Sequence, residues 1–390
     1  MKNILFVDKR TGIGLMRKIK VLFVIHDLGP GGAEKVLVNL VNNMNRDQFD
    51  ITVMSIFDEG INKQFLASNI RYCYCFRKAI RGNSHIMKFF SPQWLHSRLI
   101  KGHYDIEIAY LEGPCARVVS GCSDRNTKLI SWIHIEQHSA KSAADSFRNV
   151  KEAEKCYNRF NQIICVSQTV KDAFTKSLNI HVPVDVYYNT NESGKIIKSA
   201  SDHVDRTLFS GEEFKLVCVG KLLKNKGFDR VLRIVKKLRE EEYPVHLYIL
   251  GLGPEETYLR EYIEENGLVP YVTLLGYQTN PYKYVSRCDL FICSSYSEGF
   301  STAATEALIV GTPVCTVNVS GMQEMLGENS EYGLITDNND QALYRGIKKL
   351  IDHPDLLKYY RTQAEVRKKI FSTKDTVKAV EKLLNDIVNI

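Results

Sequence analysis

Residues 289–308 read DLFICSSYSEGFSTAATEAL, a short apolar run followed by a loop of small polar residues and a segment that favours a helix. The run 289–293 has the length and composition of a buried strand. The loop carries Glu298 and Gly299, and the helix is expected to begin near Ser301. Because the first N–H groups of a helix are unpaired and lie at its positive end, this arrangement predicts an anion-binding loop at the carboxyl end of a strand.

Two glutamates flank this turn, Glu298 in the loop and Glu306 about one turn into the helix. An ionised carboxylate only accepts hydrogen bonds, so Glu306 suits two vicinal hydroxyl groups that both donate to it. Considered singly, Glu298 fits a helix-capping role and Glu306 fits a solvated helix face. Neither role explains two glutamates around a small-residue turn at the edge of a sheet, so the pair favours a binding site.

Strand-like and helix-like segments alternate along the rest of the chain. This alternation is typical of parallel βαβ units with helices on both faces of a sheet. It predicts an α/β fold of two Rossmann-like, doubly wound domains that face each other, with ligands bound in the cleft at the carboxyl ends of the strands. The predicted strands are 19–25, 51–56, 106–110, 129–133, 163–166 and 184–188 in the first series, and 214–219, 245–249, 272–275, 289–293, 313–317 and 333–335 in the second.

Two domains are also expected from the length, since 390 residues exceed what one core usually supports. We predict an N-terminal domain over 1–195 and a C-terminal domain over 196–372. The segment 191–211 is polar and rich in Ser, Lys and Asp, and it is interpreted as the linker. Residues 373–390 have the apolar spacing of a helix and follow an already complete second domain.

The composition is that of an ordinary globular protein, with 44% hydrophobic and 25% charged residues. No apolar run approaches the ~18 residues of a membrane-spanning helix, so no integral membrane protein is expected. Residues 1–17 lack the long apolar core of a signal peptide and are interpreted as an appendage, with Met16 as an alternative start. The ten cysteines are scattered without a C-x-x-C pair. We therefore expect buried thiols in a reducing compartment rather than structural zinc or a disulfide scaffold.

The net charge of +7 is unevenly distributed. Between Gly60 and Tyr104 there is no Asp or Glu, while Lys and Arg alternate with Phe and Trp. A basic segment with exposed aromatic residues suits the surface of an anionic membrane, and this is one interpretation of residues 60–104. A solvated basic face over a core helix is the other. Nucleic acid is not expected as a partner, because no recognised nucleic-acid motif accompanies the charge.

A glycine turn, Gly29-Pro-Gly-Gly-Ala-Glu34, follows the strand 19–25. Gly31 and Gly32 would let backbone N–H groups approach a phosphate at the start of the next helix. The spacing does not match G-x-G-x-x-G, because Glu34 stands where the third glycine belongs, and this disfavours a dinucleotide-dependent oxidoreductase. A purely structural turn is the alternative.

A second loop, from Gly220 to Gly227, follows the strand 214–219 and carries Lys221 and Lys226. Ammonium groups at the carboxyl end of a strand can bind a diphosphate. Lysines in a loop are usually just solvated, and only their position at the strand end favours binding here.

The chain after about residue 18 resembles the family 4 glycosyltransferases of the GT-B fold. The resemblance rests on five motifs that stand in the family's order across both domains. They are Gly31-Gly32-Ala33-Glu34, Gly220-Lys221 with Lys226-Gly227, Gly251-x-Gly253-Pro254, the Glu-x7-Glu pair Glu298 and Glu306, and Gly311-Thr312-Pro313. The resemblance implies a deep interdomain cleft and a C-terminal helix, 373–390, that crosses back to the first domain.

The resemblance also implies roles for individual residues. It places Glu298 against the donor sugar, Glu306 on the ribose, and the backbone of Phe300, Ser301 and Thr302 on the distal phosphate. It places Lys221, Lys226 and the neighbouring Gly220 at the diphosphate, and His134 near the sugar and acceptor. Tyr277 is expected beside the base and Asn189 at the cleft, both on weaker grounds. Many relatives have Arg where this chain has Lys221, and Lys keeps the charge but not the bidentate geometry.

The implied activity is metal-independent, retaining transfer of a hexose or N-acetylhexosamine from a nucleotide-sugar, with UDP as the expected nucleotide. The expected acceptor is a glycan or a polyprenol-diphosphate-linked glycan of surface polysaccharide synthesis. No cofactor and no metal are expected, and the chain contains no Asp-x-Asp. The expected location is cytoplasmic, peripheral on the inner face of the plasma membrane. A nucleotide-sugar 2-epimerase of the same fold and a non-catalytic nucleotide-sugar-binding subunit remain as alternatives.

Overall fold

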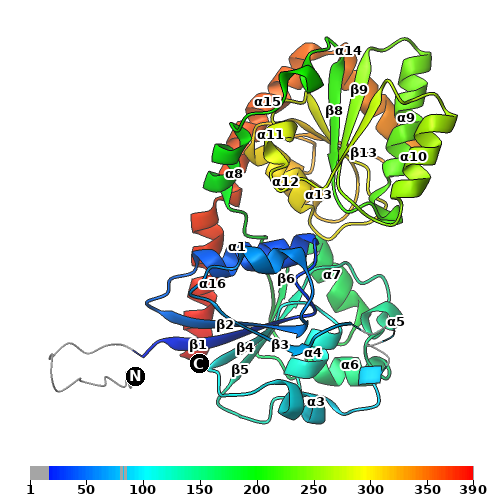
Figure 1. Cartoon of the computed structure of the whole chain (residues 1–390). Helices are drawn as coiled ribbons and strands as arrows, with labels where there is room; N and C mark the ends of the chain where they lie inside the picture. The colour runs from blue at the N-terminus through cyan, green and yellow to red at the C-terminus, as the bar shows by residue number, and fades with distance from the viewer. Residues whose placement is uncertain (1–16, 80–81, 83–85, 390) are drawn as a thin grey trace, which may run out of the picture. The chain divides into compact units, whose positions relative to one another are not determined.

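The computed structural model describes residues 17–79, 82 and 86–389, and these form two compact units (Figure 1). The first unit comprises the chain up to Val166, residues 170–187 and the C-terminal segment from Thr376. The second comprises residues 167–169 and Tyr188–Asp375. The predicted appendage 1–17 lies outside the described residues except for Arg17, whose guanidinium is 2.7 Å from the Asp105 carboxylate.

The first unit is built on a seven-stranded sheet in which all neighbouring strands are parallel. Its strands, in spatial order, are β3 (Arg71–Phe76), β2 (Phe49–Phe57), β1 (Ile19–Ile25), β4 (Ile106–Ala109), β5 (Lys128–Ile133), β6 (Gln162–Cys165) and β7 (Val184–Val186). The helices are α1 (Gly32–Asn43), α3 (Pro92–Leu99), α4 (Pro114–Val119), α5 (Ala140–Ala143), α6 (Val150–Tyr157), α7 (Gln168–Ser177) and most of α16 (Thr373–Val388), with a 3-10 turn η1 (Ile61–Phe65).

The edge strand β3 was not among the predicted strands. It lies within the basic stretch 60–104 and pairs with β2 from Thr52↔Arg71 onward. Alternating Tyr and Cys residues suit a half-buried strand, but the charge pattern suggested a surface segment or a helix face. The Tyr72 hydroxyl secures the edge, because it lies 2.6 Å from the Ser55 hydroxyl and donates to Asp58 at 2.9 Å.

The second unit is built on a six-stranded parallel sheet. Its strands, in spatial order, are β10 (Val272–Gly276), β9 (Val245–Leu250), β8 (Phe214–Val219), β11 (Leu290–Cys293), β12 (Val314–Val317) and β13 (Leu334–Thr336). The helices are α8 (Ser193–Ala200), α9 (Phe228–Glu240), α10 (Glu256–Glu265), α11 (Tyr282–Val285), α12 (Thr302–Ile309), α13 (Met322–Leu326), α14 (Asp340–Asp352) and α15 (Pro354–Arg367), with 3-10 turns η2 (Arg206–Phe209), η3 (Lys224–Lys226) and η4 (Lys368–Phe371).

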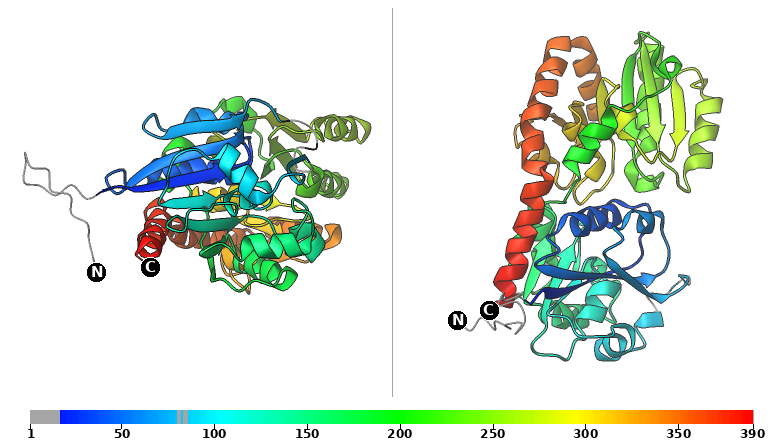
Figure 2. Two further views of the ribbon diagram at one scale, coloured as in Figure 1. Left: turned by 90° about the horizontal axis from the view of Figure 1, so that it is seen from below. Right: turned by 60° about the vertical axis from the view of Figure 1, so that its left-hand side comes forward.

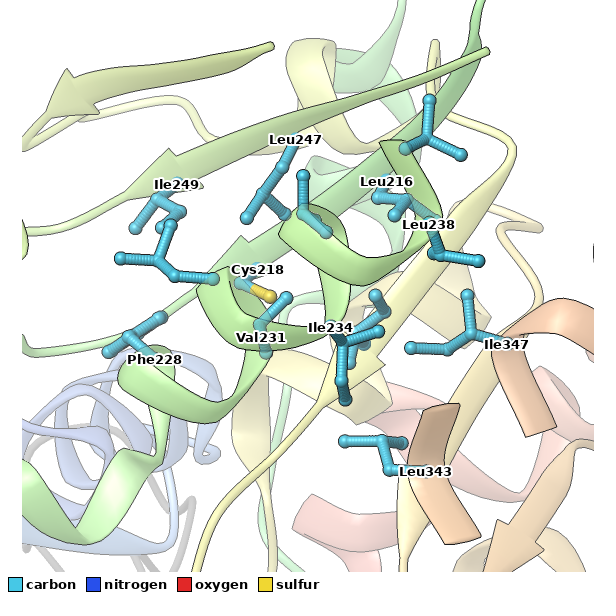
Figure 3. Close-up of a cluster of buried hydrophobic side chains, with 14 of the residues drawn as sticks. Leu216, Cys218, Phe228, Val231, Ile234, Leu238, Leu247, Ile249, Leu343 and Ile347 are labelled. Carbon is cyan, nitrogen blue, oxygen red and sulfur yellow. The ribbon is translucent and has the colours of Figure 1, made fainter. Parts of the chain in front are cut away.

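The core of the second unit forms where α9 lies on the sheet (Figure 3). Val231, Ile234 and Leu238 recur at three- and four-residue spacing, so they share one face of the helix. That face packs with side chains of β8 and β9, including Leu216 and Leu247, and the whole cluster is buried. Apolar periodicity in the sequence therefore fixes which face of α9 points inward.

The segment 191–211, predicted to be a linker, instead contains α8 and η2. Helix α8 packs on α11 and α12, so it belongs to the second unit. The division between units consequently falls between Tyr187 and Tyr188 rather than at residue 195. Polar composition hid this helix, because it buries only one large apolar side chain, Ile196.

Helix α16 confirms the prediction for the C-terminal segment. From Thr376 onward it belongs to the first unit, where it appears in red in Figure 2. Its apolar residues Val377, Val380 and Leu384 are buried. The Glu381 carboxylate accepts the backbone N–H of Asn45 at 2.5 Å, just after α1. Among the described residues, no helix combines the length and apolarity needed to cross a membrane.

Gly251 fixes the carboxyl edge of the second sheet. It has a φ of +149°, and a Cβ there would lie 1.8 Å from the carbonyl oxygen of Gly220. Gly251→Ala should therefore lower the free energy of unfolding by about 3 kcal/mol, since both the backbone conformation and the close approach exclude a side chain. Urea unfolding followed by fluorescence measures this change.

The matched control for this substitution is Gly194→Ala in α8, where a Cβ would meet nothing within 4 Å. That variant should leave the free energy of unfolding unchanged or raise it by up to about 1 kcal/mol, because alanine favours a helix. Equal stability of the two variants would contradict the role of Gly251.

Candidate active site

In the second unit, Glu298 lies in the loop between β11 and α12 and makes two short contacts. The Lys226 ammonium is 2.6 Å from its Oε1 atom, and the Ser295 hydroxyl donates to the same oxygen at 2.7 Å. The side chain of Glu298 is only 9% exposed, and that of Lys226 is 27% exposed. The pair thus brings together two residues that the sequence singled out on separate motifs. Neither of these contacts uses the second oxygen, Oε2.

The loop that carries Lys226 is held against the end of β11. Gly227 has a left-handed φ of +65°, and a Cβ there would be 2.2 Å from the Ser294 carbonyl oxygen. The Ser294 hydroxyl donates to the carbonyl of Lys226 at 2.9 Å. The Tyr296 N–H donates to the carbonyl of Asn225 at 2.7 Å. Because backbone contacts join the two loops on both sides of Lys226, the ammonium has a fixed place beside Glu298.

Helix α12 begins where the sequence predicted. Ser301 is its N-cap, and the hydroxyl accepts the Ala304 N–H at 3.4 Å. Phe300 is buried, with its ring stacked on Tyr188 at 5.3 Å between centroids and edge-on to Phe371 at 6.1 Å. This aromatic cluster anchors the residue before the cap, so the Phe300 side chain packs inside the unit and leaves its backbone as the part that could meet a ligand.

Glu306 lies in the second turn of α12 and is buried. The Tyr282 hydroxyl donates to its Oε1 atom at 3.2 Å. A buried carboxylate needs hydrogen-bond donors, so the interpretation as a solvated helix face is wrong. The structure therefore supports a buried acceptor group at this position.

The remaining predicted residues of the second unit lie at strand ends without joining this pair. Lys221 follows Gly220 directly after β8 and is exposed. Tyr277 follows β10 and is 37% exposed. Asn189, predicted as part of the first domain, belongs to the second unit and is buried. Its Oδ1 atom has no hydrogen-bond partner among the residues described.

In the first unit, His134 directly follows β5 and is buried. The backbone N–H of His134 donates to the Glu112 carboxylate at 2.9 Å, and the His134 ring lies 4.9 Å from the Tyr110 ring. Burial lowers the pKa of His134 to about 3, although a hydrogen bond with the Tyr110 backbone offsets part of the effect. Within the described structure, the buried Nε2 atom has no partner. A neutral imidazole with a free ring nitrogen is suited to hydrogen bonding with a substrate.

Two carboxylates at neighbouring strand ends were missed by the sequence analysis. Asp27 follows β1, accepts the Gly29 N–H at 2.7 Å and contacts the His26 ring at 2.7 Å. Glu112 follows β4, and burial raises its pKa against the lowering effect of the His134 N–H. Strands β1, β4 and β5 are adjacent, so Asp27, Glu112 and His134 lie along one edge of the sheet. Because Asp27 and Glu112 follow predicted strands, their positions in the sequence could have identified them as candidate site residues.

The glycine turn of the first unit does not have the surroundings that a phosphate site needs. Gly31 is the N-cap of α1, and a Cβ on it would lie 2.1 Å from the Glu34 carboxylate. The turn therefore lies between its own carboxylates, Asp27 and Glu34. This negative surrounding favours hydroxyl groups over a phosphate near Gly31 and Gly32.

Comparisons with known proteins agree with this geometry. A family model described as "Glycosyltransferase Family 4" matches residues 30–190, and one described as "Glycosyl transferases group 1" matches residues 201–367. The chain belongs to glycosyltransferase family 4. The predicted family is thus confirmed, and the protein is a glycosyltransferase by both halves of its sequence.

Relatives of this family 4 glycosyltransferase include bacterial enzymes of glycan synthesis. It is 25% identical over 366 residues to the N-acetylgalactosamine-N,N'-diacetylbacillosaminyl-diphospho-undecaprenol 4-alpha-N-acetylgalactosaminyltransferase of Campylobacter jejuni, covering 91% of this chain and 96% of that one. It is 27% identical over 150 residues to the capsular polysaccharide biosynthesis glycosyltransferase CapM of Staphylococcus aureus, covering 37% and 38% of the two chains.

Solved structures confirm the GT-B fold. HepE of Anabaena, determined in complex with UDP, superposes with a TM-score of 0.75 at 20% identity over 94% of this chain and 100% of that one. Sucrose-phosphate synthase of Thermosynechococcus elongatus gives a TM-score of 0.74 at 14% identity, covering 95% and 99%.

The lowered pKa of His134 predicts a pH dependence of folding. The ring is neutral in the folded unit, whereas in the unfolded chain its pKa is near 6.5. The neutral ring therefore contributes its full share of the folding stability above pH 6.5, and this share is lost as the pH falls toward 3. Between about pH 7.5 and about pH 5, the free energy of unfolding should fall by about 2 kcal/mol more for the wild type than for His134→Gln. Urea unfolding of both proteins at each pH measures this difference.

The control is His181→Gln, which alters an exposed histidine of the same unit. That variant should lose stability with falling pH as the wild type does. A His134→Gln variant with the wild-type pH dependence would show that this ring is not held neutral by burial.

Proposed function

We propose that this family 4 enzyme transfers a hexose or N-acetylhexosamine from a UDP-sugar to a glycan or polyprenol-diphosphate-linked glycan, with retention of anomeric configuration and without a metal ion. The observation that carries the proposal is the Lys226–Glu298 pair beside the start of α12, with Glu306 buried one turn further on. Two relatives support the substrates: HepE binds UDP and UDP-glucose, and the Campylobacter enzyme is named for an undecaprenol-diphosphate-linked acceptor.

The donor chemistry follows from charge. Breaking the anomeric C–O bond leaves negative charge on the nucleoside diphosphate, and preorganised donors lower the barrier to that step. Lys226, the exposed Lys221 and the N–H groups at the start of α12 supply positive charge and dipole at one sheet edge. Glu298 accepts hydrogen bonds from sugar hydroxyls, and Glu306 accepts them from the ribose.

The metal-free part of the proposal rests on the residues available. Metal-dependent sugar transferases often hold a cation with Asp-x-Asp, which is absent from the sequence. Lys226 provides a fixed cation instead, and a helix N-terminus favours a phosphate without further charge. Retention would follow if the leaving phosphate takes the acceptor proton on the same face of the sugar. The neutral His134 of the first unit is proposed to hydrogen-bond to a hydroxyl group of the acceptor.

Substitution of the two glutamates tests the assignment of roles. Glu298→Gln should lower kcat with UDP-sugar donors by roughly 10²–10³-fold while UDP affinity changes little, because it removes an acceptor at the reacting sugar. Glu306→Gln should weaken UDP binding by about tenfold, since it removes a charged hydrogen-bond partner of the ribose. UDP release over a panel of donors and acceptors, together with calorimetric UDP titration, measures both.

The matched control is Glu328→Gln, an exposed glutamate of the same unit. It should leave kcat and UDP affinity unchanged. Unaltered turnover in Glu298→Gln would refute the proposed site. A product formed from the donor alone, with no acceptor consumed, would identify an epimerase instead.

We also propose that the first unit binds an anionic membrane surface through the turn 86–90 and α3. Phe89 is 82% exposed, and Phe90 stacks on the exposed Trp94 at 4.2 Å. The fully buried Arg117 donates to the carbonyls of Met87 and Phe90 at 2.6 and 2.7 Å. This turn is therefore rigidly held with its aromatic side chains outward. The exposed Arg98 and Lys101 add positive charge nearby.

Liposome co-sedimentation tests this surface. The wild type should bind vesicles containing phosphatidylglycerol more strongly than neutral phosphatidylcholine vesicles, because charge attracts it and aromatic rings insert at the headgroups. A double substitution, Phe89→Ser with Trp94→Ser, should reduce the bound fraction severalfold. Val269→Ser, at an exposed apolar residue of the second unit, is the control and should bind as the wild type does. Equal binding to both vesicle types would remove the proposal.

A further inference from the structure

Three residues with metal-binding side chains meet inside the first unit, away from the proposed site. Glu107 lies in β4, His96 in α3, and Cys122 shortly after α4. The His96 Nε2 atom is 2.8 Å from the Glu107 carboxylate, and the three ligand atoms all lie within 4.8 Å of one another. Glu107 precedes the carboxyl end of its strand, whereas Glu112 and His134 follow strand ends.

The position of Glu107 is unusual for a carboxylate. It lies in a central strand between Leu22 of β1 and Leu129 of β5, and it is 3% exposed. A charge removed from water in this way costs several kcal/mol unless a partner offsets it. His96 supplies one partner. The site therefore favours positive charge next to Glu107.

The backbone holds the three side chains together. Gly121, next to Cys122, approaches α3 so closely that a Cβ would lie 1.9 Å from the Pro92 carbonyl oxygen. The Arg159 guanidinium donates to the carbonyl of Cys122 at 2.6 Å. Helices α3 and α4 also pack against each other. The cluster is thus fixed by tight packing and not by flexible side chains that happen to meet.

The donor set indicates which ion would bind. Imidazole nitrogen, thiolate sulfur and carboxylate oxygen are the ligands of Zn²⁺, while Ca²⁺ and Mg²⁺ take oxygen. Zinc bond lengths of about 2.0–2.3 Å place ligand atoms roughly 3.3–3.8 Å apart in a tetrahedron. The His96 Nε2–Glu107 distance is 2.8 Å and no two ligand atoms are more than 4.8 Å apart, so shifts of about 1 Å reach these values.

We propose that His96, Glu107 and Cys122 bind one Zn²⁺ ion that ties α3 to the sheet. On binding, the Cys122 thiol releases its proton to solvent. The proton shared between His96 Nε2 and the Glu107 carboxylate is released as well, and both atoms then bond to the metal. Three protein ligands leave one coordination position for water. The ion stabilises the helix that carries Trp94, and it takes no part in sugar transfer.

Cobalt substitution tests the site in the full-length protein. After treatment with a chelator, titration with Co²⁺ under a phosphine reductant should bind one equivalent and give a thiolate-to-cobalt charge-transfer band with tetrahedral d–d bands. Zn²⁺ should displace the cobalt, and elemental analysis should find one zinc per chain. Cys122→Ser should abolish the charge-transfer band, and His96→Gln should weaken Co²⁺ binding at least about tenfold.

Cys156→Ser is the control, because Cys156 is a buried cysteine of the same unit outside the cluster. It should keep the spectrum of the wild type, and circular dichroism of all variants reports their folding. If the wild type shows no thiolate band at stoichiometric Co²⁺, or if Cys122→Ser retains the band, the proposal fails and the cluster is a metal-free His–Glu pair. The wild-type spectrum alone decides this even where a variant does not fold.

Discussion

The ion pair between Lys226 and Glu298 is the contact on which the site of the second unit depends. A carboxylate that is 9% exposed is costly without a partner, and the ammonium at 2.6 Å offsets that cost. The two residues come from different strand-to-helix loops, so the pair exists only if both loops have one conformation. Gly227, which places backbone where a Cβ would overlap Ser294, supplies that constraint. Local backbone geometry therefore sets the electrostatics of the site.

The strand ends of the two sheets carry opposite chemistry. In the second unit they present lysines and the start of α12, which suit a diphosphate. In the first unit they present Asp27, Glu112 and a neutral His134, which suit hydroxyl groups. A diphosphate would be repelled by the first set, and a hydroxyl nucleophile gains little from the second. The charge of each unit thus favours a different half of a glycosyl transfer reaction.

Much of the fold could be predicted from the sequence, because parallel strands and their helices alternate with clear apolar runs. The start of α12 at Ser301 was predictable from its small polar loop, and Glu298 and Lys226 from their places after strands. The strand β3 and helix α8 were not predicted, since β3 has only half-buried and exposed residues and the polar helix α8 buries only Ile196. The cluster of His96, Glu107 and Cys122 could not be predicted, because it depends on the close approach of Gly121 to Pro92.

The Lys226–Glu298 pair also bears on how the donor site could favour bond breaking over mere binding. An ammonium already paired with a carboxylate attracts the bound diphosphate less than a free one, so ground-state binding gains little from it. In the proposed reaction, breaking the C–O bond places new negative charge on the leaving phosphate and adds to its attraction to Lys226. The sugar, which the proposal places beside Glu298, becomes positive at the same time. Lys226 and Glu298 would then each interact more favourably with the reacting groups than they do before the bond breaks. An interaction that strengthens in the transition state accelerates the reaction, whereas one of equal strength throughout does not.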